Sequence, residues 1–371
     1  MLLKTVRNLR CLHQKRLCSN VRTPENRMRA WQIHSYGDLG ELQLSKTRLP
    51  IIASPKELLV KVEASSINPI DYMMIGGYAK TVANFFRKYE LEFPLILGRE
   101  FCGTILDKGQ DVTDQFKVGD PIYGVVNIHK PGSHAETVIA EESLICHKPK
   151  NLSSVEAASI MYAGLTAWSA LFITGELSIR NPKLSRVLVL GASGGVGTLA
   201  VQMLKSQGST VVATCSSNAI PLVQSLGVDQ TFDYADINFT NNIAEQGFYD
   251  IILDCAKFGY DKVPSEWRYN KFITLNSPLM NNADNFGLLG GFAASAKDLL
   301  FANFAKCPQG QSVRWGFFTP SQSGIQFIDK LVKNGKINPV IHKVFKFDEL
   351  PKAYECLQEG HLRGKIVIDY N

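Results

Sequence analysis

The residues with the clearest chemical meaning are four glycines in VLVLGASGGVG, residues 187–197. Gly191, Gly194, Gly195 and Gly197 follow an apolar run and lead into a segment whose apolar residues recur at helical spacing. A glycine-rich turn between a buried strand and a helix lets the backbone approach a pyrophosphate, whose charge meets the amides and dipole of the helix N-terminus. The turn therefore predicts a dinucleotide site; the alternative is a tight turn that holds no ligand.

The residues after the next predicted strand, TVVATC, indicate which dinucleotide would bind. An acid at the end of that strand would hold the ribose 2′-hydroxyl of NAD. Here Ser216 and Ser217 follow the strand, and no acid occurs before Asp229. Small hydroxyls leave room for a 2′-phosphate and can hydrogen-bond it, so NADPH is favoured. No Lys or Arg occurs between Lys205 and Lys257, so a cation for that phosphate must come from elsewhere in the fold.

Strands and helices alternate around the glycine turn. Strand-like runs at 187–190, 210–215, 230–234, 249–255 and 271–276 are separated by helix-like segments, which predicts a parallel sheet covered on both faces. The chain before residue 150 instead shows short apolar runs broken by turn residues, the pattern of a mainly β domain. The final GKIVIDY strand returns to that pattern. We therefore expect the parallel sheet to be inserted into a β domain that the C-terminus closes.

Basic residues are concentrated at the N-terminus. Residues 1–29 hold eight of the 40 Lys and Arg and one of the 34 acids, which leaves 32 bases and 33 acids in the rest of the chain. A near-neutral body argues against nucleic-acid binding. The leader MLLKTVRNLRCLHQKRLCSN is basic, poor in acids and amphipathic, which is typical of a mitochondrial transit peptide. The alternative is a disordered basic tail on a cytosolic enzyme.

Cysteine usage and hydropathy limit the remaining classes. The eight cysteines include no C-x-x-C pair, which favours free thiols in a reducing compartment over a disulfide framework. We find no uncharged apolar run that approaches the roughly 18 to 20 residues of a membrane span, so the protein is not expected to be transmembrane.

From about residue 28 to its end, the sequence resembles the zinc-free quinone oxidoreductase type of the medium-chain dehydrogenases/reductases. The segments that carry the resemblance are ASSINPID, LGREFCGTI, KVGDPIYG, GSHAETVIA, AGLTAWSAL, LGASGGVG and GHLRGKIVI. It implies an α/β fold in which a GroES-like, β-rich catalytic domain contains an inserted, doubly wound Rossmann domain. The implied division is a transit peptide at 1–27, the catalytic domain at 28–152 and 319–371, and the NADPH-binding domain at 153–318.

The resemblance also implies cofactor contacts at positions along the Rossmann domain. Ser193, Gly194, Gly195 and Val196 would face the phosphates. Ser216 would take the 2′-phosphate, and Tyr234 would lie near the adenosine unless it is a buried core residue. Leu275, Gly316 and Phe318 would line the nicotinamide side, although packing alone would also explain the Leu and Phe.

Two further contacts would come from the polar loop before the last strand. His361 and Arg363 would reach the cofactor from the catalytic domain, and Arg363 is one answer to the missing cation. The alternative is a solvated loop without a ligand. Thr166 could contact the nicotinamide carboxamide, or its hydroxyl could bond back to its own helix.

The resemblance leaves no place for a metal. Zinc members of the superfamily need a Cys in the catalytic loop, a G-H-E sequence and a lobe of four cysteines, whereas this chain has Asn68, then Gly98, Arg99 and Glu100, and only Cys102 nearby. Without a Lewis acid the acceptor must tolerate direct hydride addition, as a quinone or an enone does. Asn68 and Tyr72 are the catalytic candidates. Related reductases commonly carry their Tyr one position later, so packing is the alternative for Tyr72.

These features predict an NADPH-dependent enzyme that reduces a quinone or a ubiquinone precursor in the mitochondrial matrix. The leader, CSSN, RWGFF and GHLRGK resemble a mitochondrial branch of the family tied to ubiquinone metabolism, which implies reticulon-type or ubiquinone-pathway protein partners. The alternatives are an enoyl-thioester reductase and an NADPH-binding interaction protein without turnover. The apolar segment 277–313 is expected to form either a lid or a contact in a homodimer, since family members often pair through the Rossmann sheet edge.

Overall fold

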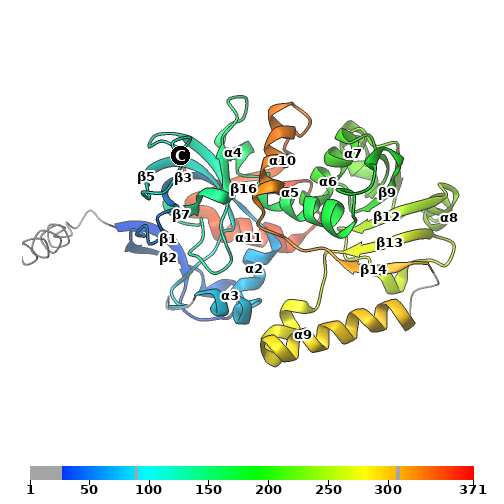
Figure 1. The fold of residues 1–371 in the computed structure, drawn as a ribbon, viewed down its shortest axis with the longest axis horizontal. Coiled ribbons are helices and arrows are strands. Elements are labelled where there is room, and N and C mark those ends of the chain that lie inside the picture. The colour runs from blue at the N-terminus through cyan, green and yellow to red at the C-terminus, as the bar shows by residue number, and fades with distance from the viewer. Residues whose placement is uncertain (1–26, 88–90, 306–309) are drawn as a thin grey trace, which may run out of the picture.

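The computed structural model describes residues 27–87, 91–305 and 310–371 (Figure 1). The predicted transit peptide lies outside the described residues except for Arg27. The described chain forms two parts, one built on a parallel sheet and the other on two mainly antiparallel sheets.

The parallel sheet has six strands in the order β11-β10-β9-β12-β13-β14. Their bounds are β9 Arg186–Leu190, β10 Thr210–Cys215, β11 Gln230–Asp233, β12 Phe248–Asp254, β13 Arg268–Thr274 and β14 Ser312–Trp315. Every neighbouring pair is parallel. The chain moves outward from β9 to β11 and then resumes on the other side of β9 with β12. The strand order therefore reverses beside β9, where doubly wound sheets bind their ligands.

Helices cover both faces of this sheet because successive strand residues point to opposite faces and the residues on both faces are apolar. Val187 and Val189 pack with residues of α5, α6 and α10, whereas Leu188 and Leu190 pack toward α8 and Trp267. The helices of this part are α4 Ser154–Ala157, α5 Met161–Trp168, α6 Gly195–Ser206, α7 Ile220–Ser225, α8 Phe239–Glu245, α9 Leu279–Ala305 and α10 Gln322–Lys333. The predicted parallel sheet with two covered faces is confirmed.

The second part is formed by both ends of the described chain. Its larger sheet has the order β15-β16-β3-β5-β6-β8, with β7 paired to β3, and its smaller sheet has the order β2-β1-β4. The bounds are β1 Arg27–Ile33, β2 Gln43–Arg48, β3 Glu57–Ile67, β4 Leu95–Ile96, β5 Glu100–Lys108, β6 Pro121–Val125, β7 Thr137–Glu141, β8 Ile145–His147, β15 Ile341–Lys346 and β16 Lys365–Asp369. Because β16 pairs with β3, the C-terminal strand closes this domain, and the predicted insertion of the Rossmann domain is confirmed.

Short helices complete the β-rich domain and the connections. They are α2 Pro69–Ile75, α3 Lys80–Arg87 and α11 Leu350–Glu359, with a π-helical turn at Ser169–Thr174. The 3₁₀ turns are Leu39–Glu41, Glu142–Leu144, Pro182–Leu184, Ser217–Ala219, Tyr260–Lys262 and Phe347–Glu349.

One helical stretch, Ser154–Thr174, is long and apolar enough to cross a membrane by length and composition alone. The expectation that no uncharged run approaches this length was wrong, because residues 157–175 contain no Asp, Glu, Lys or Arg. In the structure 78% of its most apolar window is buried inside the protein, as in the core helix of a globular domain.

The apolar segment 277–313 is mostly one long helix, α9, with a break at Gly287, where φ is +72°. Figure 1 shows α9 beside β14, extending away from the sheet. Several of its large side chains are exposed: Phe286, Leu289, Phe292, Leu300, Phe301 and Phe304. Its first part packs on α3 of the β-rich domain, so α9 connects the two parts of the molecule.

Candidate functional site

The glycine turn has the geometry that a pyrophosphate site needs. Gly191 takes φ of +76°, and a Cβ at Gly197 would lie 2.3 Å from the Gly191 carbonyl oxygen, so close packing of strand and helix requires both glycines. A Cβ at Gly194 would instead have only the Gly191 oxygen near it, at 3.6 Å. The open space above Gly194 lies at the N-terminus of the 12-residue helix α6, whose first N–H groups lack partners within the helix. These residues fit a dinucleotide phosphate.

The loop before the last strand reaches this turn from the β-rich domain. The N–H of Gly364 donates to the carbonyl oxygen of Ser193 at 2.8 Å, and Gly194 and Gly364 form a parallel bridge. His361 is exposed and has φ of +51°. The structure thus brings the predicted loop and the predicted turn together.

The predicted 2′-phosphate site lies at the carboxyl ends of β10 and β11. Ser216 follows β10 directly, and its hydroxyl donates to Asn218 Oδ1 at 2.7 Å. Burial and, to a smaller extent, the carboxylate of Asp233 raise the pKa of Cys215 to about 11, and the guanidinium of Arg363 opposes this shift. Arg363 therefore lies close enough to the end of β10 to affect the pKa of Cys215 electrostatically. Its guanidinium is a positive charge near a strand end whose own sequence, between Lys205 and Lys257, has no Lys or Arg.

Tyr234 lies at the same edge of the sheet. Its side chain is 51% exposed, and its N–H donates to the carbonyl oxygen of Cys215 at 3.2 Å. The alternative of a buried core tyrosine is therefore wrong.

The residues predicted for the nicotinamide side gather at the ends of β13 and β14. The N–H of Gly316 donates to Thr274 O at 2.9 Å, and a Cβ at Gly316 would lie 2.9 Å from Leu275 Cδ2. Phe318 stacks on Tyr162 of α5 with ring centroids 4.1 Å apart. Leu275 and Phe318 also pack against the main core, so both contribute to packing as well.

Asn68 lies across the domain junction at the start of α2. Its N–H donates to Asp71 Oδ2 at 2.8 Å, and its side-chain Oδ1 accepts a hydrogen bond from Lys365 Nζ. The side chain is 2% exposed, and its Nδ2 has no hydrogen-bond partner among the described residues. A buried amide donor without a partner costs about 1 to 3 kcal/mol, so the position is unfavourable unless another group accepts from it.

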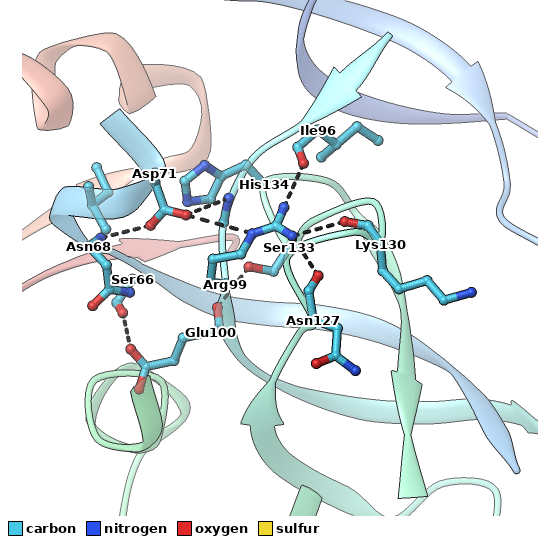
Figure 2. Close-up of polar contacts among 12 residues, drawn as sticks. Ser66, Asn68, Asp71, Ile96, Arg99, Glu100, Asn127, Lys130, Ser133 and His134 are labelled. Atoms are coloured by element: carbon cyan, nitrogen blue, oxygen red, sulfur yellow. Dashed lines mark hydrogen bonds and ion pairs between the residues drawn. The ribbon is translucent and has the colours of Figure 1, made fainter. Parts of the chain in front are cut away.

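A buried polar cluster supports this end of α2, as Figure 2 shows. Asp71 accepts from the Gly98 N–H at 3.1 Å, and the Arg99 guanidinium lies 3.9 Å away. Burial raises the pKa of Asp71 to about 6, with Arg99 opposing the shift. Asp71 therefore holds Asn68 in place through the backbone.

Arg99 occupies the position of the histidine in the G-H-E sequence of zinc enzymes. It is 1% exposed, and its guanidinium donates to the carbonyl oxygens of Ile96, Asn127 and Lys130 at 2.8 to 2.9 Å. These bonds connect β4 to the loop after β6 (Figure 2). Among the described residues, no three His, Cys, Asp or Glu side chains form a group that could hold a metal ion.

Glu100 and Lys365 form a second buried ion pair in this region. Lys365 Nζ lies 3.3 Å from Glu100 Oε2, which also accepts from the Ser66 hydroxyl at 2.5 Å, and Oε1 accepts from the Tyr162 N–H at 2.9 Å. Sequence reasoning did not select Lys365. Its only signal was its place in GHLRGKIVI beside the predicted loop.

Tyr72 and Thr166 both have side-chain partners away from the glycine turn. The Tyr72 hydroxyl accepts a hydrogen bond from Gln358 Nε2 of α11, and its ring centroid lies 6.4 Å from that of Tyr354. These contacts favour the packing alternative for Tyr72. The Thr166 hydroxyl donates to Tyr162 O at 2.9 Å, the bond within the helix that was its alternative.

Comparison with known proteins agrees with this geometry. Residues 54–151 match the family of alcohol dehydrogenase GroES-like domains, and residues 226–368 match the family described as zinc-binding dehydrogenase. The chain is 46% identical over 358 residues to a Drosophila melanogaster protein named mitochondrial NAD(P)H oxidoreductase RTN4IP1, covering 92% of this chain and 86% of the relative. It is 37% identical to the Homo sapiens protein of that name, covering 92% and 89%.

Solved structures show the same fold. The quinone oxidoreductase of Coxiella burnetii superposes with a TM-score of 0.72 at 26% identity, covering 93% of this chain and 100% of that protein.

A further sequence relative comes from Caenorhabditis elegans. It is 36% identical over 94% of this chain and 97% of its own length, and it is named mitochondrial reticulon-4-interacting protein 1. The chain therefore belongs to the medium-chain dehydrogenase/reductase family and is a mitochondrial NAD(P)H oxidoreductase of the quinone oxidoreductase type.

Proposed function

We propose that the protein uses NADPH to reduce a quinone or a ubiquinone precursor in the mitochondrial matrix. The observation that carries the choice of cofactor is that the loop holding Arg363 is bonded to the glycine turn through Gly364, with the guanidinium near enough to Cys215 to affect its pKa, while Ser216 and Asn218 stand where an acid would hold a ribose 2′-hydroxyl. A guanidinium next to small hydrogen-bonding side chains suits a phosphate and gives no advantage to NADH.

The choice of acceptor rests on the residues around Asn68. When bound, NADPH supplies a hydride, and reduction of a quinone to a quinol needs one further proton. Asn68 offers an amide donor to a carbonyl oxygen, and the described residues near it hold no metal-ligand group. Such a site suits a conjugated acceptor that accepts hydride directly, and Ser193, Gly195 and Val196 would hold the phosphates on the opposite side.

The deciding experiment measures oxidation of NADPH and, separately, of NADH by protein that begins at residue 28. A short-chain ubiquinone analogue and an enoyl-CoA are offered as acceptors in parallel. We expect turnover with the quinone and NADPH, with NADH at least about tenfold less efficient. Faster turnover of the enoyl-CoA would replace the quinone with an enoyl thioester. Tight NADPH binding without oxidation by either acceptor would identify a cofactor-binding interaction protein.

Partners belong to the same proposal. The name of the Caenorhabditis elegans relative suggests a reticulon-type partner, and the proposed substrate suggests ubiquinone-pathway proteins. Two copies would pair at the β14 end of the parallel sheet, where Asn303 of α9 already bonds the outward N–H and carbonyl oxygen of Val313, so the contact would involve α9. Light scattering of the protein beginning at residue 28 tests the homodimer directly.

A further inference from the structure

Lys365, the first residue of β16, is buried between the two domains. It is 5% exposed, and its Nζ contacts three acceptors: Ile67 O at 3.2 Å, Glu100 Oε2 at 3.3 Å and Asn68 Oδ1. An ammonium group has three N–H donors and no acceptor, so these partners match its full capacity. Three acceptors hold the ammonium group of Lys365 in one orientation. The polar groups that face it must therefore present acceptor atoms.

The first consequence concerns the amide of Asn68. Because the ammonium can only donate, the group that faces it must be the amide oxygen, and Nδ2 must point away. Nδ2 is also the polar atom of Asn68 that has no partner among the described residues. Lys365 thus determines that Asn68 offers a donor, rather than an acceptor, to any group that reaches it.

The second consequence concerns the glycine turn. A Cβ at Gly195 would lie 3.0 Å from Lys365 Cδ, so the aliphatic part of Lys365 packs directly on this glycine. The preceding residue, Gly364, donates its N–H to Ser193 O at 2.8 Å. One residue therefore contacts the turn that would hold the cofactor phosphates and also the amide at the opposite side of the site.

We propose that Lys365 is a positioning residue for hydride transfer, which fixes the amide of Asn68 relative to the glycine turn. Glu100 holds the ammonium in place and balances its charge. The inference rests on the roles proposed above for Asn68 and for the glycine turn. It predicts that the ammonium contributes to the rate only while the Asn68 amide is present.

A double-mutant cycle tests this dependence. Lys365→Met keeps an unbranched apolar side chain against Gly195 and removes the ammonium, Asn68→Ala removes the amide, and the third variant carries both changes. Each is assayed for NADPH affinity by fluorescence and for kcat and KM with the acceptor that the wild type reduces. Lys343→Met, at an exposed lysine of the neighbouring strand β15, is the matched control.

We expect Lys365→Met to lower kcat by about tenfold or more while NADPH affinity changes less than about threefold. In the Asn68→Ala protein the same change should lower kcat by less than about twofold. An equal loss in both backgrounds, or a loss confined to NADPH affinity, would overturn the proposal. If the wild type reduces neither acceptor, the proposed function is wrong. That result comes from the wild-type assay alone and so is distinct from the result of the double-mutant cycle.

A second variant guards against loss of folding. Removing one partner of a buried ion pair leaves an uncompensated charge, whereas removing both is often tolerated. Lys365→Met combined with Glu100→Gln removes both charges and keeps the side-chain volumes. We expect this protein to melt cooperatively and to show the same low kcat as Lys365→Met. Wild-type kcat in the folded double variant would contradict the positioning role.

Discussion

Asp284 accepts a hydrogen bond from the backbone N–H of Thr81 at 2.9 Å and another from that of Ala79 at 2.6 Å. A carboxylate from α9, next to the Rossmann sheet, thus binds the start of α3 in the β-rich domain. Negative charge at a helix start satisfies N–H groups that the helix cannot. The side chain therefore connects the two domains.

Asp284→Ala should loosen this connection. We expect the free energy of unfolding to fall by about 1 to 2 kcal/mol, as for loss of a helix cap, and amide hydrogen exchange at Ala79 and Thr81 to accelerate. Asp298→Ala, in the same helix, is the control because the carboxylate of Asp298 accepts from Asn282 on α9 itself. Unchanged exchange at Thr81 in Asp284→Ala would show that other contacts hold the two helices together.

Gly195 and Gly197 should respond differently to the same substitution. In Gly195→Ala the new Cβ meets Lys365 Cδ at 3.0 Å, a contact that a shift of a few tenths of an ångström in the aliphatic chain relieves, so the fold should survive while the methyl group blocks close approach of the cofactor phosphates. We expect NADPH affinity to fall by about tenfold or more, which is about 1.4 kcal/mol. Fluorescence titration measures this, and near wild-type affinity would argue against phosphate binding at this turn.

In Gly197→Ala the Cβ would lie 2.3 Å from a backbone oxygen that cannot move aside. We expect a loss of several kcal/mol in unfolding free energy, as for overpacking in a core. Thermal denaturation of the two variants separates the functional glycine from the structural one, and equal melting temperatures would contradict that division.

Arg363→Met should discriminate between the two nicotinamide cofactors. If the guanidinium binds the 2′-phosphate, its loss raises KM for NADPH by about tenfold to a hundredfold and leaves KM for NADH unchanged. Arg180→Gln, at a half-exposed arginine paired with Glu176, is the control. Equal losses with both cofactors would mean that Arg363 supports the fold of the loop, whose N–H at this residue donates to His342 Nδ1.

The local parts of this site could be predicted from sequence, and the long-range parts could not. The strand, glycine turn and helix at 186–206 follow one another along the chain, so periodicity and turn chemistry were sufficient. The bond between Lys365 and Asn68 joins residues 297 positions apart, and no local pattern encodes it. The electrostatic influence of Arg363 on Cys215 likewise depends on how β16 closes the β-rich domain against the Rossmann sheet. The sequence could not decide whether Tyr234 is exposed or buried, because an aromatic residue at a strand end fits both the protein surface and the core.

Tyr72→Phe tests the remaining catalytic candidate. The hydroxyl is bound by Gln358 and the ring packs beside Tyr354, so we expect kcat within about threefold of wild type, whereas Asn68→Ala should lose about tenfold or more. Steady-state kinetics at several pH values is the measurement. A large loss in Tyr72→Phe that depends on pH would restore Tyr72 as a proton donor.

The buried carboxyl group of Asp71 should give the unfolding free energy a specific pH dependence. Burial raises its pKa from 3.8 to about 6, so between these values the folded protein keeps a proton that the unfolded chain releases. Stability from this group is therefore complete below about pH 4 and is lost as pH rises through about 6, a change of roughly 3 kcal/mol. Asp71→Asn cannot titrate, so the unfolding free energy of wild type minus that of the variant should fall by this amount between about pH 4 and about pH 7. His134, whose pKa burial lowers to about 3, changes the unfolding free energy with pH in the opposite direction. Because it is present in both proteins, its contribution cancels in the difference.

Urea unfolding between about pH 4 and about pH 7 measures the difference in unfolding free energy between wild type and Asp71→Asn. A constant difference would show that Asp71 stays ionised throughout, held by Arg99 and the N–H groups of Asn68 and Gly98.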